Sequence, residues 1–266
     1  MLNIVTAARS GQGQRSNNED SVCHGSAPGG WYAVVADGAG GHRRGSEASA
    51  RTIHVIESML HSASESAFAP QTLTRIVCSA HAELQRHQVA NDPSASMHST
   101  VVVLWIDVVC RYALWAHVGD SRLYRVRHGL VDLVTNDDSV VQQMVTAGLI
   151  TAEQARRHPY KNQLVAALGV EGAVDPHTVM RPVSLKEGDA FLLCSDGWWD
   201  SLDLTIIAAT LGQASTPDDW LALMEHRIER RALPRQDNFS AVALWAGDPA
   251  ATLEASADDT IPLSRR

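Results

Sequence analysis

The stretch WYAVVADG, residues 31–38 of this 266-residue chain, carries the pattern from which the fold can be predicted. Six apolar residues run without interruption into an aspartate and a glycine, which is typical of a buried β-strand that ends in a turn. Apolar runs also predict strands over residues 112–118 and 190–194, and each is followed two positions later by an aspartate, Asp120 or Asp196. Three strands that end in aspartates predict a sheet with carboxylates along one edge.

The remaining pattern predicts a single mixed α/β domain. Apolar runs predict further strands over residues 100–106 and 240–245, the second of which follows Asp237 and Asn238. Helical spacing and capping residues predict helices over residues 46–60, from Pro70 to about residue 84, and from Thr151 and Thr216 onward. Few large apolar residues follow Gly247, so residues 1–247 are expected to form the domain and residues 248–266 a flexible C-terminal tail.

Composition excludes several classes of protein. Lysine and arginine number 22 and the acidic residues 30, so the net charge is 22 − 30 = −8. This acidity disfavours a nucleic-acid-binding protein, which usually has a basic surface. The longest apolar run, residues 101–106, is far shorter than the roughly 20 residues of a membrane span. The N-terminus lacks the pattern of a signal peptide, so a cytoplasmic protein is expected.

The aspartates indicate a metal site. If the strand ends converge, Asp37, Asp120, Asp196 and Asp237 would raise one another's pKa, and a hard divalent cation would relieve their repulsion. An all-oxygen ligand set favours Mg²⁺ or Mn²⁺ over zinc. Each Asp-Gly pair taken alone is also an ordinary turn, so spacing leaves both interpretations open. The histidines show no metal-binding spacing, and His117 is expected to be a hydrogen-bonded core residue rather than a metal ligand.

Several motifs together resemble those of the metal-dependent Ser/Thr protein phosphatases of the PPM, or type 2C, family in its bacterial form. They follow the family's order from about Thr6 to Trp245, nearly the whole chain. The motifs are RSNNED at residues 15–20, VADGAGGH at 35–42, MHST at 97–100, HVGDSR at 117–122, HPYKN at 158–162, ALG at 167–169, LCSDG at 193–197 and QDN at 236–238.

The resemblance implies an α+β fold, a four-layer α-β-β-α sandwich of two antiparallel sheets flanked by helices. It also implies two or three Mn²⁺ or Mg²⁺ ions at one end of the sandwich, which activate a water molecule to attack phosphorus. Asp37 would be the bridging ligand that orients this water, and Gly38 a carbonyl ligand. The other implied ligands are Asp196 and Asp237 for the second ion, Asp120 with Asp196 for a weaker third ion, and Asp20 and Glu19, acting directly or through water.

The resemblance also implies how substrate is held and where this chain differs. Arg15 matches the arginine that binds the substrate phosphate. Members with histidine directly after the first Asp-Gly can use it as the general acid, but this chain has Ala39 there. His42, a metal-bound water or no group at all would take that role. Asp138 stands where many members have histidine, and residues 137–172 match the mobile flap in which substrate choice is expected.

The leading hypothesis is therefore a protein phosphatase that acts on phospho-Ser and phospho-Thr and opposes a bacterial Ser/Thr kinase. One alternative is a pseudophosphatase that binds phosphoproteins without hydrolysing them. That hypothesis predicts the loss of at least one of Asp37, Asp196 and Asp237, and all three are present. A second alternative is hydrolysis of a small phosphate ester at the same metal centre.

Overall fold

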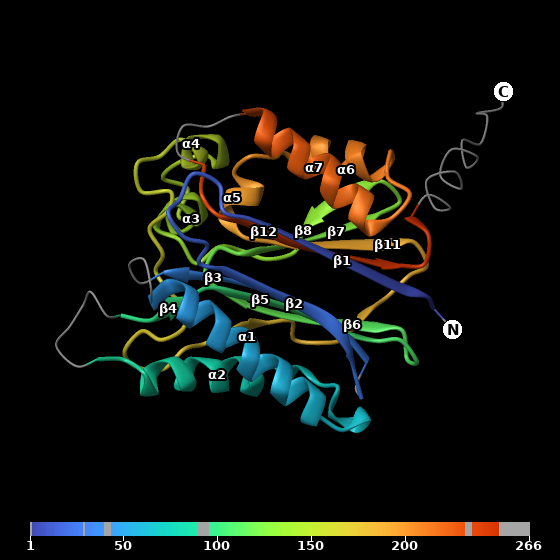
Figure 1. Cartoon of the computed structure of the whole chain (residues 1–266), viewed down its shortest axis with the longest axis horizontal. Coiled ribbons are helices and arrows are strands. Elements are labelled where there is room, and N and C mark those ends of the chain that lie inside the picture. Colours follow the sequence, from blue (N-terminus) through green and yellow to red (C-terminus); the bar gives the residue numbers. More distant parts are fainter. Residues whose placement is uncertain (1, 29, 40–43, 90–95, 232–235, 250–266) are drawn as a thin grey trace.

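The computed structural model describes residues 2–28, 30–39, 44–89, 96–231 and 236–249. Two antiparallel sheets pack face to face, and helices cover the outer face of each (Figure 1). The predicted α-β-β-α sandwich is confirmed. Of the predicted tail, residues 250–266 lie outside the described residues, and the domain boundary at residue 247 stays a prediction.

One sheet has five strands, all antiparallel to their neighbours. In spatial order they are β1 (Ile4–Gly11), β12 (Phe239–Ala246), β11 (Asp189–Cys194), β7 (Arg122–Arg127) and β8 (Leu130–Leu133). The central strands β11 and β12 are buried along their whole length, as their uninterrupted apolar sequence predicts.

The second sheet has seven strands, also antiparallel. Its main path is β10 (Val183–Ser184), β6 (Tyr112–Val118), β5 (Val101–Asp107), β3 (Gly30–Ala39) and β2 (Asp20–Ala27). Two short strands extend it, because β4 (His98–Ser99) pairs with β3 and β9 (His177–Thr178) pairs with β6.

Helices form the two outer layers. α1 (Arg44–Ser62) and α2 (Pro70–Arg86) cover the seven-stranded sheet, whereas α6 (Leu204–Leu211) and α7 (Pro217–Arg231) cover the five-stranded sheet (Figure 1). Capping starts two helices as predicted: Thr216 Oγ1 accepts from the Asp219 amide, and Thr151 forms a capping box with Gln154. The remaining elements are the 3₁₀ turn η1 (Glu65–Ala67) and the short helices α3 (Val140–Thr146), α4 (Ala152–Arg156) and α5 (Asp196–Trp199).

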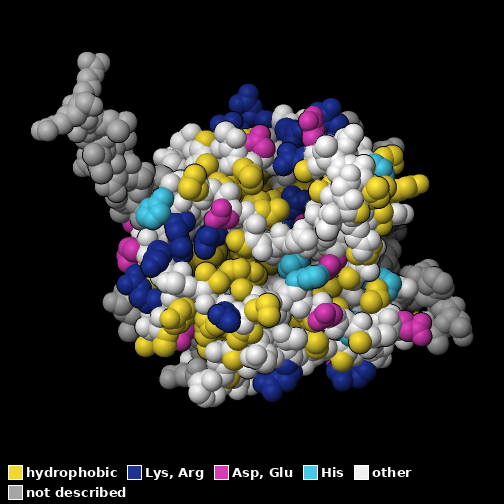
Figure 2. All heavy atoms as spheres, turned by 180° about the vertical axis from the view of Figure 1, so that it is seen from behind, with side chains coloured by type: hydrophobic (Ala, Val, Ile, Leu, Met, Phe, Trp, Pro, Cys, Tyr) yellow, Lys and Arg dark blue, Asp and Glu magenta, His cyan; other side chains and the backbone are white. Residues whose placement is uncertain are grey.

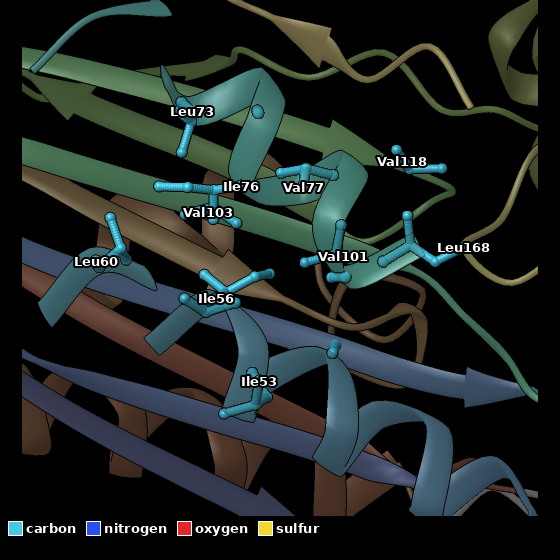
Figure 3. Packing of buried hydrophobic residues seen from close by; sticks show 14 of the residues in the cluster. Ile53, Ile56, Leu60, Leu73, Ile76, Val77, Val101, Val103, Val118 and Leu168 are labelled. Carbon is cyan, nitrogen blue, oxygen red and sulfur yellow. The ribbon is translucent and has the colours of Figure 1, made fainter. Parts of the chain in front are cut away.

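Apolar side chains fill three interfaces: one between the sheets and one beneath each pair of helices. Under α1 and α2, side chains from both helices point toward those of β5 and β6 (Figure 3). Ile56, Leu60 and Leu73 are fully buried there, so this layer fixes both helices on the sheet. On the opposite face from Figure 1, charged side chains of both signs are interspersed with hydrophobic ones (Figure 2). Within the described residues, no helix combines the length and apolarity needed to cross a bilayer.

The strand ends are close to their predicted positions, with one difference that bears on the site. β3 was expected to end at Ala36, but it continues through Asp37 to Ala39. Gly38 and Ala39 pair with Ser99 and His98 of β4, and this short strand extends the ladder. Asp37 therefore lies inside a strand, where both neighbouring strands restrict its backbone.

The buried ion pair between Arg127 and Asp189 is expected to contribute to the stability of the fold. The Asp189 carboxylate is fully buried, and Arg127 Nε and Nη2 each donate to one of its oxygens at 2.6 Å. Arg127→Ala leaves that carboxylate buried without its cation, so we expect a loss of about 3 kcal/mol in the free energy of unfolding. The melting temperature should fall by roughly 6–12 °C. Arg125→Ala on the same strand breaks the pair with the half-exposed Asp132 and should cost about 1 kcal/mol or less. Equal melting temperatures for the two variants would contradict this assignment.

Candidate active site

Strand register and strand ends bring the predicted carboxylates to one end of the sandwich. Asp20 of β2 lies directly opposite Asp37 of β3 in the antiparallel ladder, so both side chains share one face. Asp196 follows the end of β11 and Asp237 precedes β12; because these strands are antiparallel neighbours, the two positions meet at one edge. Asp120 follows β6 in the other sheet. Residues distant in sequence thus meet between the ends of both sheets.

A single cavity of about 340 Å³ collects these groups. Seven of the predicted site residues line it: Arg15, Glu19, Asp37, Gly38, Asp120, Asp196 and Asp237. Asp20 lies behind the cavity, where Ser195 Oγ donates to its Oδ2 at 2.8 Å. The predicted acid His42 lies outside the described residues, and so do Gly40 and Gly41.

The crowded carboxylates hold protons more tightly than free aspartates. Burial raises the pKa of Asp37 well above its usual 3.8, and the neighbouring Asp20, Asp196 and Asp120 raise it further. Burial also raises the pKa of Asp196, and the nearby carboxylates of Asp120 and Asp237 raise it further. Burial also raises the pKa of Asp20 to about 6 and of Asp120 to about 7. The raised pKa values show that the ionised carboxylates are destabilised in this cavity. A bound cation would offset that destabilisation, so the cavity is suited to binding cations.

Two further features fit a hard cation. Asp20 is buried, and its Oδ1 has no hydrogen-bond partner among the described residues. At Gly38, an added Cβ would lie 2.0 Å from the Gly45 carbonyl oxygen and 2.9 Å from that of Glu19. Only glycine fits between these backbones, which brings the Gly38 peptide close to the carboxylates. The donor set is carboxylate and carbonyl oxygen, the set that Mg²⁺ and Mn²⁺ prefer.

Asp120 is positioned by Trp199 of the short helix α5. Trp199 Nε1 donates to the Asp120 carbonyl oxygen at 2.9 Å, and the Arg122 guanidinium lies 3.5 Å from the centre of the Trp199 ring. Arg122 also makes two hydrogen bonds, of 2.9 and 2.7 Å, to Asp137. This stack fixes the backbone that carries the Asp120 carboxylate.

Arg15 was expected to bind the substrate phosphate, and in the structure its partner is the carboxylate of Asp237. Its guanidinium is exposed at the cavity and pairs with Asp237 Oδ2, so it contacts an implied metal ligand. Asp237 Oδ1 accepts from the Asn238 amide at 2.9 Å, so protein donors engage both oxygens. A cation at Asp237 and the Arg15 guanidinium would compete for the same oxygen. The pairing nevertheless holds Arg15 at the mouth of the cavity, within reach of an anion that enters it.

Three polar residues at the site lie within the sequence motifs but were not predicted to have a role there. Asn238 binds the opening loop, since its Nδ2 donates to the Gln12 and Asn17 carbonyls and its Oδ1 accepts from the Glu19 amide. Thr100 Oγ1 accepts from the Asp37 amide at 3.1 Å. Asn162 lines the cavity from the flap region. Their places inside the motifs were the only signal, because amide and hydroxyl side chains carry no distinctive spacing.

This fold and this group of carboxylates define a class of protein. Residues 9–225 match the sequence model of the family Protein phosphatase 2C, and the chain belongs to that family. Sequence relatives include the serine/threonine protein phosphatase PstP of Mycobacterium tuberculosis, which is 36% identical over 208 residues. That match covers 76% of this chain but 38% of PstP, so the chain spans well under half of that relative's length.

Two further comparisons agree. The protein phosphatase PhpP of Streptococcus pneumoniae is 31% identical over 194 residues, which cover 69% of this chain and 74% of PhpP. Among solved structures, the catalytic domain of PstP in complex with 2 manganese ions superposes with a TM-score of 0.80 at 29% identity. That superposition covers 93% of this chain and 100% of the other. The similarity therefore includes both sheets and the end of the sandwich that carries the carboxylates.

Proposed function

We propose that this protein is a metal-dependent serine/threonine phosphatase that hydrolyses phospho-Ser and phospho-Thr in protein substrates. One observation carries the proposal: four aspartates from both sheets line one cavity together with Arg15, and a fifth, Asp20, lies behind it. The structure of the PstP catalytic domain is a complex with 2 manganese ions, and this supports a metal-dependent reaction. A Ser/Thr kinase that produces the substrates and a cytoplasmic location belong to the same proposal.

The proposed ligand set is the one that the family resemblance implies. Asp37 and the Gly38 carbonyl would hold the first ion, and Asp37, Asp196 and Asp237 the second. Asp120 with Asp196 would hold a weaker third ion, while Asp20 and Glu19 would act directly or through water. When bound, the Mn²⁺ or Mg²⁺ ions supply a water nucleophile of lowered pKa and offset the charge of the phosphate.

The chain's own residues bind the substrate phosphate and keep the carboxylates in place. Arg15 would leave Asp237 and donate to the phosphate oxygens, since a planar guanidinium matches their geometry. Thr100 fixes the Asp37 backbone and Asn238 fixes the loop before Asp20. The described lining of the cavity contains no histidine, so His42 as the proton donor stays a prediction.

The first experiment compares substrates and tests the metal requirement together. Purified protein with Mn²⁺ is expected to hydrolyse a phosphothreonine peptide with a higher kcat/KM than p-nitrophenyl phosphate. Excess EDTA should abolish both activities, and added Mn²⁺ or Mg²⁺ should restore them, because all the cavity's proposed ligands are oxygens. Full peptide turnover by metal-stripped protein would contradict the metal-dependent mechanism.

The same assay separates the alternatives. Peptide binding without turnover in Mn²⁺ would favour the pseudophosphatase. A small ester hydrolysed far better than the peptide would favour the small-molecule hydrolase. The complete ligand set favours the active protein phosphatase over the first of these.

Arg15→Ala tests the phosphate contact apart from the metal ligands. It removes a charge-assisted hydrogen bond worth roughly 1.5–3 kcal/mol, so kcat/KM for the peptide should fall by about 10- to 150-fold. The substitution also frees Asp237 Oδ2, so Mn²⁺ affinity measured by calorimetry should stay at the wild-type value or rise. The matched control is Arg181→Ala, an exposed arginine outside the cavity lining, which should keep wild-type kcat/KM. A fall in Mn²⁺ affinity in Arg15→Ala would mean that Arg15 supports the metal site rather than the phosphate.

A further inference from the structure

A second group of metal-ligating side chains lies outside the carboxylate centre. His117 of β6 and His177 of β9 are register partners, and Asp138 lies on the segment that follows β8. Each of the three offers one ligand atom, and these atoms all lie within 4.8 Å of one another. The imidazole rings stack with centroids 4.9 Å apart. Backbone pairing therefore holds two imidazoles beside one carboxylate.

His117 is already in the tautomer that a metal ligand needs. Its Nε2 lies 2.8 Å from the Asn136 carbonyl oxygen, and because that oxygen can only accept, Nε2 must carry the hydrogen. In the neutral ring Nδ1 therefore carries the lone pair. Burial lowers the pKa of His117, which favours this neutral ring. A backbone carbonyl that accepts from the second ring nitrogen is a common support of metal-bound histidine.

The Nδ1 atom of His117 is also unsatisfied. His117 is 96% buried, and Nδ1 is inaccessible with no hydrogen-bond partner among the described residues. Buried polar atoms of side chains are almost always paired, so an orphaned nitrogen beside a carboxylate and a second imidazole requires an explanation. A cation bound at the cluster would supply the missing partner.

Asp138 and His177 complete the group in different ways. Asp138 is fixed, because its Oδ2 accepts from the Gly119 amide at 2.9 Å and its backbone bonds to Gly119 and Val165. Its Oδ1 lies 2.8 Å from His177 Nε2. The His177 side chain is 56% exposed, so its ring can turn and solvent ions can reach it. A cation would take the place of the hydrogen on His177 Nε2, and in the neutral ring that hydrogen would move to the Nδ1 atom.

We infer that His117, Asp138 and His177 form a binding site for a borderline divalent cation of the Zn²⁺ type, distinct from the carboxylate centre. Two imidazole nitrogens and one carboxylate oxygen suit Zn²⁺, Co²⁺ or Ni²⁺ better than Mg²⁺ or Mn²⁺. Ligand atoms of a tetrahedral zinc site lie about 3.4 Å apart, so the widest separation in the group must shorten by up to about 1.4 Å, while the 2.8 Å between Asp138 Oδ1 and His177 Nε2 must lengthen slightly. The exposed His177 ring supplies that movement.

The ion would connect two parts of the structure that meet beside the active site. Gly119, which donates to Asp138, directly precedes Asp120 of the cavity. Asp138 opens the segment that continues through α3 and α4 and returns at Val165, whose amide donates to the Asp138 carbonyl. A bound cation would thus fix the base of this segment to the end of β6. We expect Zn²⁺ to raise the melting temperature through this site.

The test titrates metal-stripped protein with Zn²⁺ in excess Mg²⁺. The wild type is expected to bind one more Zn²⁺ than His177→Ala, and Asp138→Asn should bind that ion at least about tenfold more weakly. Co²⁺ should give a visible absorption band in the wild type that His177→Ala lacks. The matched control is His226→Ala, an exposed histidine of α7, which should keep the wild-type stoichiometry and spectrum.

Two results would overturn the inference. One is the same zinc stoichiometry and the same Co²⁺ spectrum in wild type and His177→Ala. The other needs no variant: imidazole ¹⁵N spectra of the wild type must show two histidine rings that change on Zn²⁺ addition while Nε2 of the buried ring stays protonated. Spectra without that change would exclude a two-histidine site even if a variant failed to fold.

Discussion

Asp37→Asn is expected to lower kcat for a phosphothreonine peptide by at least about 10³-fold, which corresponds to about 4 kcal/mol in the activation free energy. The substitution keeps the size of the side chain and removes the charge proposed to bridge two cations. Asp37 lies inside β3, and its amide donates to Thr100 Oγ1, so the backbone should stay in place. Phosphate release measures the fall in kcat, and calorimetry with Mn²⁺ should show weaker binding.

The variant should be folded, which separates loss of chemistry from loss of structure. Asp37 is crowded by the carboxylates of Asp20 and Asp196, and a neutral amide removes one like charge from that group. The metal-free variant should therefore melt at or above the wild-type temperature at pH 8. Asp132→Asn, at a half-exposed ion pair on β8, is the matched control and should keep wild-type kcat. Normal Mn²⁺ binding with wild-type kcat in Asp37→Asn would show that the site is assigned wrongly.

The strands that could be predicted are those that are buried on both faces. β5, β6, β11 and β12 consist of apolar runs, and their observed bounds lie within one residue of the prediction. β1 and β2 were not predicted. Their sequences IVTAARSG and DSVCHGSA mix small and polar residues, and most of their side chains are only partly buried. They are strands because eight register pairs join β1 to β12 and eight join β2 to β3, and such long-range pairing is invisible to local pattern.

The site residues also fall into two groups, those that local sequence pattern locates and those whose contacts link distant parts of the chain. An aspartate after an apolar run is a local signal, and it located Asp120 and Asp196 correctly at one cavity. The ion pair between Arg15 and Asp237 joins residues 222 positions apart, and no local sequence pattern predicts such a distant contact. His117 was expected to be a hydrogen-bonded core residue rather than a metal ligand. It is buried and bonded to Asn136 as expected, whereas the proposed zinc site departs from the second half of that expectation. The neighbouring His177 comes from the two-residue strand β9, which is too short to be predicted from sequence.

The raised pKa values of the carboxylates also predict how stability depends on pH. In the folded protein the pKa is about 6 for Asp20 and about 7 for Asp120, against an ordinary value of 3.8. Because the folded state holds protons that the unfolded state has lost, this contribution is complete below pH 3.8. It disappears as the pH rises through 6 and 7. Metal-free protein should therefore lose unfolding free energy between pH 5 and pH 8, on the order of 4 kcal/mol from Asp20 and Asp120 together, and the raised pKa values of Asp37 and Asp196 act in the same direction.

For a chain of this size, that loss corresponds to a melting temperature roughly 10 °C lower at pH 8 than at pH 5, which calorimetry in EDTA can measure. Asp120→Asn should reduce the difference, because its carboxyl is one of those whose pKa is raised in the folded state. Saturating Mn²⁺ should reverse the trend, since cations bind the ionised carboxylates and stabilise the folded state most where those groups have lost their protons. A metal-free protein that melts at the same or a higher temperature at pH 8 would mean that the carboxylates of this cavity are not held together against their own repulsion.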